Sequence, residues 1–331
     1  MPDRTSLAHL AALTTGAARS RAGRTALTVL LEDADHLAEL TRRDVLEGDT
    51  VIFAPAGTAP SAAGGPAVIG YRGGLGSPAD QLWLDESFVM EVQSYAVSGF
   101  LAVHGPTLLR ICGAEDLLAL GADAVRARDH GRLPRIAASP LVHLADTPAL
   151  GWPGTAHRSR RIQVRADGAI AVSATGSPVG TLDTLTPGVL ARLAETGSGA
   201  STALRAAVDD ADVERLRREV PWLSRYLAVV AAVRAARACG AQVDAVSGLG
   251  TRLDPRVPLE DGSRPADRPV IVLAADRALV VDPVTGRGIY LDLARATALE
   301  RQLDGTGDPA GARFATALAT RGFELGTQVA A

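Results

Sequence analysis

The pattern that most constrains the fold lies near the carboxyl end of the chain, from residue 268 onward. Three short apolar runs follow one another at 270–273, 278–281 and 288–291, and two segments with apolar residues at helical spacing come after them. Short apolar runs between turn residues are typical of strands, whereas a repeat of three to four residues is typical of helices. The order strand, strand, strand, helix, helix predicts a compact winged-helix-like module at 268–331, with a three-stranded sheet plus helices.

The two helices of this module have recognisable faces and ends. In 293–303 the residues Ala296, Leu299 and Leu303 recur at helical spacing. The second helix, 309–321, begins with a proline in its first turn, where the missing N–H costs nothing, and Gly322 follows as a stop signal. Neither helix can bury its apolar stripe alone, so we expect both to pack on the three strands.

Upstream of the module the pattern is that of an α/β protein. Strand-like runs at 26–31 and 50–53 flank a helical segment at 34–43, which predicts a covered sheet in a domain spanning 1–150. Other expected elements in this domain are strands at 100–103, 108–111 and 139–145 and a helix at 114–128.

The middle of the chain, 151–252, is expected to hold a β-hairpin and then helices. The turn dipeptide Asp167-Gly168 separates two apolar runs, which is a hairpin signal. Helical spacing follows up to Gly240, and the Pro- and Arg-rich stretch 253–267 is expected to be a linker. The fold class is therefore α/β (α+β), with a mixed N-terminal region, a helical middle and the C-terminal module.

Composition excludes several chemistries. The net charge is −3, and all 34 basic residues are arginine. A Walker-type phosphate loop and a pyridoxal Schiff base both need lysine, so neither is available. The glycines between 68 and 76 do not form GxGxxG, which favours turn or loop glycines over a nucleotide cradle.

No catalytic or metal-binding motif is complete. The chain has no Gly-x-Ser-x-Gly, its six histidines are scattered, and Cys112 and Cys239 form no CxxC pair. We therefore expect no catalytic residue, no metal and no cofactor, which favours a protein that is not an enzyme. The segment 157–161, with Arg165 beyond it, is the densest basic patch and favours a solvated loop, with docking of an acidic peptide or nucleic acid as the alternative.

The chain carries no convincing membrane or secretory signal. Its N-terminal apolar stretch is short and interrupted by His9, and the apolar segment 222–239 contains Arg225, Arg234 and Arg237. We expect a cytoplasmic protein without a membrane partner.

The terminal module resembles a known family. The run from Ala278 to Asp292, with the turn Asp282-Pro283-Val284-Thr285-Gly286 inside it, and the segment from Ala298 to Gly305 are similar to the precursor-peptide recognition element of ribosomally made peptide (RiPP) clusters. That element is typified by the small peptide chaperone of pyrroloquinoline quinone biosynthesis. The chain's size and its actinobacterial-looking composition resemble the recognition proteins of daptide-type natural product clusters. The family's middle helix has no room between Gly305 and Pro309.

The resemblance implies a function and a site. In the family an unmodified leader peptide adds as a strand beside the third strand and lies against a helix, which presents it to tailoring enzymes. The peptide-binding residues that it implies here are Gly288, Ile289, Tyr290, Leu291, Phe314, Leu318 and Arg321.

Two other functions stay open at this point. One is an enzyme of nucleotide or acyl-group chemistry that uses the N-terminal α/β region. The other is a winged-helix transcriptional regulator, although the second helix of the module offers only Arg313 and Arg321 to a nucleic acid, which argues against that partner.

Overall fold

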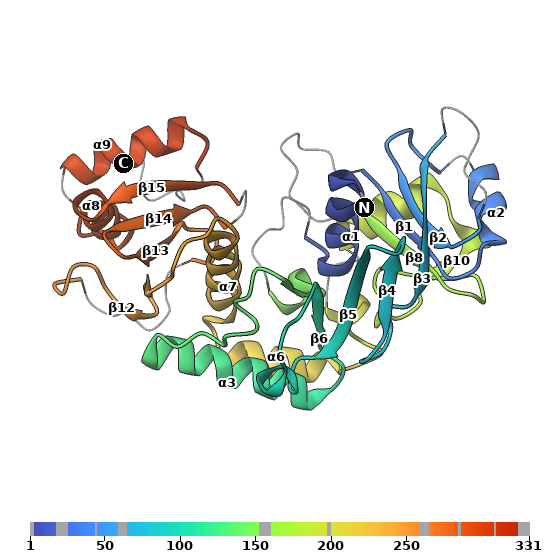
Figure 1. The fold of residues 1–331 in the computed structure, drawn as a ribbon, viewed down its shortest axis with the longest axis horizontal. Helices are drawn as coiled ribbons and strands as arrows, with labels where there is room; N and C mark the ends of the chain where they lie inside the picture. Colours follow the sequence, from blue (N-terminus) through green and yellow to red (C-terminus); the bar gives the residue numbers. More distant parts are fainter. Residues whose placement is uncertain are drawn as a thin grey trace. The chain divides into compact units, whose positions relative to one another are not determined.

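The computed structural model describes residues 3–17, 26–43, 45–58, 65–151, 160–196, 200–257, 265–283, 286–307 and 309–323. They form a mixed α/β fold with two sheets, which confirms the expected class (Figure 1). The chain divides into two compact units: residues 1–118, 141–150 and 155–215 make the first, and residues 119–140, 151–154 and 216–331 make the second. Helices α3 (Ala114–His130) and α6 (Asp210–Glu219) each begin in the first unit and end in the second. These units divide the chain differently from the segments expected at 1–150 and 151–252.

The first unit is built on a ten-stranded sheet in the order β10-β9-β8-β1-β2-β3-β4-β5-β6-β7. Strands β8, β1, β2 and β3 run parallel to one another, and so do β5, β6 and β7. The strands are β1 (Thr28–Leu31), β2 (Val51–Pro55), β3 (Ala67–Gly73), β4 (Gln81–Leu84), β5 (Phe88–Ser94), β6 (Thr107–Arg110), β7 (Val142–Leu144), β8 (Arg161–Val164), β9 (Ala169–Ala171) and β10 (Gly180–Thr181).

Helices cover both faces of this sheet. On one face Leu10 and Leu13 of α1 pack in a core with Leu30 and Phe53. On the other face Leu40 and Leu190 pack in a second core. Strands covered on both sides read as continuous apolar runs, which explains why β1 and β2 were predictable. The helical segments are α1 (Arg4–Thr15), α2 (His36–Arg42), α4 (Pro187–Thr196), α5 (Ala200–Ala203) and the 3-10 helices η1 (Ser98–Phe100), η2 (Thr147–Leu150) and η4 (Leu182–Thr184).

Three local expectations in the first unit can be compared directly. Strands β8 and β9 form the expected antiparallel hairpin, with Gly168 at a φ of 78° in the turn. The strand expected at 100–103 is wrong, since η1 ends at Phe100 and no strand follows there. The loop assignment at 68–76 is partly wrong, because Gly70 lies within β3 and Gly73 ends it.

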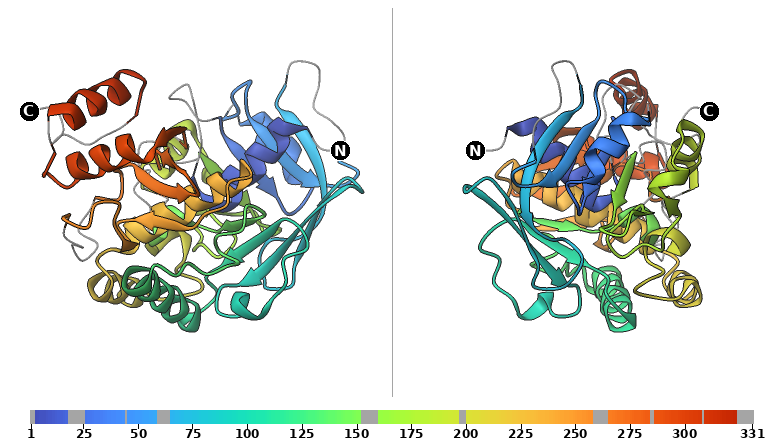
Figure 2. Two further views of the ribbon diagram at one scale, coloured as in Figure 1. Left: turned by 60° about the vertical axis from the view of Figure 1, so that its left-hand side comes forward. Right: turned by 90° about the vertical axis from the view of Figure 1, so that its right-hand side faces the viewer.

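The second unit holds a five-stranded sheet in the order β12-β11-β13-β14-β15. Helices α8 and α9 pack against each other, and α8 contacts β14 and β15 (Figure 2). Their core includes Leu299, Leu318 and Leu291, while α7 packs on β13. The elements are α7 (Leu223–Ala238), β11 (Ala245–Ser247), β12 (Gly250–Thr251), β13 (Val270–Ala274), β14 (Arg277–Val281), β15 (Gly288–Asp292), α8 (Leu293–Leu303) and α9 (Pro309–Thr320).

The C-terminal sheet is larger than the three strands expected. Strand β11 pairs with β13 and therefore joins residues on both sides of the expected linker 253–267 into one sheet. Residues 258–264 of that linker lie outside the described residues, but Asp254 and Val257 within it are buried.

Among the described residues, no helix combines the length and apolar character needed to cross a membrane.

Candidate functional site

Strand β15 lies at the end of its sheet. In the described part of the chain it pairs with β14 alone, in an antiparallel register that sets Tyr290 opposite Leu279 and Ile289 opposite Val280. A terminal strand presents one row of backbone N–H and C=O groups that its own sheet does not use. This edge is the feature on which strand addition depends.

The register shows which backbone groups face outward. Asp282 donates its N–H to the carbonyl of Arg287 at 2.8 Å, so these two residues form a hydrogen-bonded pair. Antiparallel ladders alternate, so Ile289 and Leu291 also direct their backbone groups toward β14. Gly288 and Tyr290 therefore direct theirs to the open edge.

The side chains of β15 divide between two faces. Leu291 is buried and Ile289 is half-buried against the core under α8 and α9. On the opposite face Tyr290 is 45% exposed, and the guanidinium of Arg277 lies 5.3 Å from its ring centre. The edge thus has an apolar side next to the helices and an aromatic side with a cation.

Helix α9 supplies the other implied residues. Gly311, Ala315 and Leu318 are its buried stripe, so Leu318 belongs to the core of the unit and is not exposed to a ligand. Phe314 is half-buried against the same core, and Arg321 is exposed just beyond the helix. Because seven residues make nearly two helical turns, Phe314 and Arg321 share one flank of α9.

The end of α9 is held beside the start of β15. The guanidinium of Arg287 donates to the carbonyl of Arg321 at 3.1 Å, which joins the residue after α9 to the residue before β15. Gly322, at a φ of 79°, ends the helix, and Phe323 donates its N–H to the carbonyl of Leu318. This arrangement is a Schellman motif, in which a glycine adopts the left-handed conformation and the next residue bonds back to the last turn of the helix. It explains why Gly322 followed by Phe323 ends the helix.

The implied residues therefore do not all face a ligand. Gly288, Tyr290 and Arg321 are exposed, and Ile289 and Phe314 are half-buried. Leu291 and Leu318 are buried and support the edge from behind. The surface that a visiting chain could contact is made of the first five.

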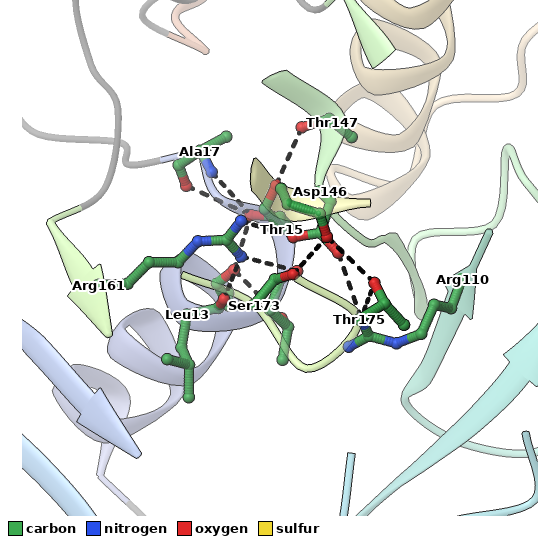
Figure 3. Close-up of polar contacts among 12 residues, drawn as sticks. Leu13, Thr15, Ala17, Arg110, Asp146, Thr147, Arg161, Ser173 and Thr175 are labelled. Carbon is green, nitrogen blue, oxygen red and sulfur yellow. Dashed lines mark hydrogen bonds and ion pairs between the residues drawn. The ribbon is translucent and has the colours of Figure 1, made fainter. Parts of the chain in front are cut away.

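Sequence reasoning missed a buried charged cluster in the first unit (Figure 3). Asp146 is fully buried and accepts from Arg161 at 2.5 Å and from Arg110 at 3.2 Å, and the two arginines approach it from opposite sides. Arg161 also donates to the carbonyls of Leu13 and Thr14 at the end of α1. Each carboxylate oxygen has an arginine partner, so the cluster joins α1, β6, β7 and β8 structurally.

The burial of Arg161 in this cluster corrects one prediction from the sequence. The solvated-loop interpretation of 157–161 is wrong for Arg161, and residues 157–159 lie outside the described residues.

A second buried carboxylate, Glu300 of α8, was also missed. It accepts from the hydroxyl of Ser247 and from the backbone N–H groups of Leu253 and Asp254. These contacts join the β11–β12 segment to α8 and leave Glu300 fully buried. A carboxylate that accepts three hydrogen bonds is a fixed structural group.

The alternative sites gain no support from the geometry. Within the described ranges, no group of three or more His, Cys, Asp and Glu side chains is placed to hold a metal ion. The glycines of 68–76 belong to β3 and the turn after it, and the next element is strand β4, not a helix whose N-terminus could bind phosphate.

The fold and the site define a mixed α/β protein with an open β edge beside a helix. Comparison with protein-family models, with curated proteins and with solved structures found no match to this chain.

Proposed function

We propose that this protein recognises a ribosomally made precursor peptide by strand addition to β15 and presents it to modifying enzymes. The observation that carries the proposal is the position of β15 at the end of its sheet, with Gly288 and Tyr290 directing backbone groups outward. Recognition by strand addition needs an unpaired edge for backbone bonds and side-chain contacts for selectivity. The described chain offers such an edge at β15, with the exposed side chains of Tyr290 and Arg321 near it as support for the second requirement.

Proline substitution tests the backbone part of this proposal. Tyr290→Pro removes an outward N–H without removing a bond of the β14–β15 ladder, because proline is tolerated where a strand's N–H faces away from its sheet. Tyr290→Val keeps the N–H and removes only the aromatic ring. We expect Tyr290→Pro to weaken peptide binding at least tenfold and Tyr290→Val to weaken it less, measured by fluorescence anisotropy.

The peptides for this measurement are labelled segments of short peptides encoded beside the gene. Residue-resolved hydrogen exchange is the matched control: the amide of Tyr290 should exchange fast in the free protein and slowly with peptide, while that of Ile289 is slow in both. Equal affinity of the two variants would contradict strand addition. Slow exchange of Tyr290 in the free protein at high concentration would assign the edge to a second copy of the chain.

A further inference from the structure

The charged groups around the β15 edge are distributed unevenly. At the Gly288 end, Arg287 and Arg321 meet where the end of α9 is tied to β15. Among the described residues of α9 and its C-terminal turn, 309–323, no side chain is acidic. At the other end of the strand, Asp292 is already engaged, since it caps α8 through Arg295 N at 2.8 Å and lies 3.3 Å from the Arg295 guanidinium.

The apolar groups come next along the same face. Ile289 follows Arg287 by two residues and lies on the same face of the sheet, since strand side chains alternate. Phe314 lies on the same flank of α9 as Arg321. Both Ile289 and Phe314 are half-buried against one core. We call the side chains of Arg287, Ile289, Phe314 and Arg321 the helix-side wall of the edge. This wall is cationic at the Gly288 end and apolar in the middle.

We propose that this wall selects an extended peptide in which an Asp or Glu lies two residues away from a large apolar residue. Both side chains would face α9, with the carboxylate beside Arg321 and the apolar group between Ile289 and Phe314. The spacing of two follows from the strand period, because only alternate residues of an added strand face the same side. This inference rests on the proposed function and adds the chemical pattern of the ligand.

Arg321 is the residue best suited to bind the carboxylate of the peptide. It is exposed, and no ion pair to it is found within the described ranges. Arginine offers a planar fork of donors that matches a carboxylate. On the opposite face, Arg277 stacks on Tyr290 and lies 3.6 Å from the exposed Asp276, so its charge is partly offset.

A display experiment tests the pattern even when the natural ligand has not been identified. A phage library of random twelve-residue peptides is selected against the full-length chain. We expect enriched sequences that combine an apolar residue with Asp or Glu at a distance of two. For the best peptide, a Glu→Gln or Asp→Asn change should weaken binding about three- to tenfold at low salt and less at high salt.

A double-mutant cycle then assigns the contact. Arg321→Gln should weaken binding of the acidic peptide by a similar factor and remove the effect of the peptide's amide substitution. Arg313→Gln, which removes the same charge from another position on α9, is the matched control and should change affinity less than twofold.

The outcomes separate the two proposals. Failure to enrich any peptide, or binding that Tyr290→Pro leaves intact, would overturn the proposed function. Peptides that need the β15 edge but show no acidic preference, or that bind Arg321→Gln as well as the natural chain, would overturn only the charge pattern.

Discussion

Tyr71 shows how burial changes the chemistry of a single side chain. Its hydroxyl donates to the carbonyl of Leu31 at 2.8 Å, and its ring lies in the core under α1. Burial, and secondarily the charge of Glu32, raise the pKa of Tyr71 from its ordinary value of 10.0 to about 12. The folded state therefore retains a proton that the unfolded state loses first.

The raised pKa predicts a loss of stability at alkaline pH. Below about pH 10 the hydroxyl is protonated in both states and its stabilising contribution is complete; that contribution falls as pH rises from about 10 to 12. Since one pKa unit corresponds to ~1.4 kcal/mol, the loss is roughly 2–3 kcal/mol. Urea unfolding at pH values from about 8 to 11.5 should show a steeper decline for the natural chain than for Tyr71→Phe. Parallel declines would refute the assignment.

Residue-scale features of this kind were the hardest to predict from the sequence. Asp146 lies 36 positions after its partner Arg110 and 15 positions before its partner Arg161 in the sequence. Arg161 in turn lies 148 positions after Leu13, whose carbonyl it contacts. No local pattern marks a contact that forms only when distant strands and a helix come together. Arg161 therefore looked like one member of an exposed basic patch.

At the scale of elements, the Asp146 cluster fastens the end of β7 to the start of β8 and to the end of α1. Two buried arginines share one carboxylate, and burial lowers the pKa of Arg110 while Asp146 opposes that shift. Removing one member of a buried charged cluster leaves the others without a counter-charge, which costs ~3–5 kcal/mol.

This predicts that Asp146→Asn destabilises the first unit strongly. The free energy of unfolding, from urea titration followed by circular dichroism, should fall by about 3–5 kcal/mol. Asp212→Asn is the matched control, because Asp212 pairs with Arg215 on a helix surface and its loss should cost less than ~1 kcal/mol. A similar decrease in the free energy of unfolding for both variants would show that the buried cluster stabilises the protein no more than a surface ion pair.

Elements with strong local signals were predicted well. The β8–β9 hairpin follows from Asp167-Gly168, and β13, β14, β15, α8 and α9 follow from apolar runs with clear ends. Strands β11 and β12 have only three and two residues and carry no such signal. Their place in the sheet depends on tertiary contacts: β11 pairs with β13, β12 pairs with β11, and the buried Glu300 accepts a hydrogen bond from Ser247 of β11.

At the scale of the whole molecule, neither compact unit is one continuous piece of chain. Within the second unit, Trp222 donates to the carbonyl of Ala124 at 3.1 Å, and Arg128 stacks on the Trp222 ring. The buried α7 and strand β11 both precede residue 253 but belong with the C-terminal sheet. The sequence suggested a separable module at 268–331 because the strands and helices of that range follow one another without interruption. The elements that cover its sheet, α7 and β11, come from earlier in the chain.

We therefore predict that the fragment 268–331 does not fold alone. Without β11, strand β13 becomes an exposed edge, and without α7 the apolar residues Val270 and Val272 lose their cover. Circular dichroism and thermal melting should show no cooperative transition for 268–331, whereas 216–331 retains more secondary structure. A sharp melt and dispersed amide resonances for the short fragment would contradict this.

The shortness of β15 has a kinetic consequence. The strand has five residues, and Asp292 ends it by capping α8. Only a few backbone bonds can form along such a short edge, each worth about 0.5–1.5 kcal/mol net. Under the function proposed above, a peptide held this way would have a short residence time, so it would reach a modifying enzyme by simple dissociation, with no energy source to eject it.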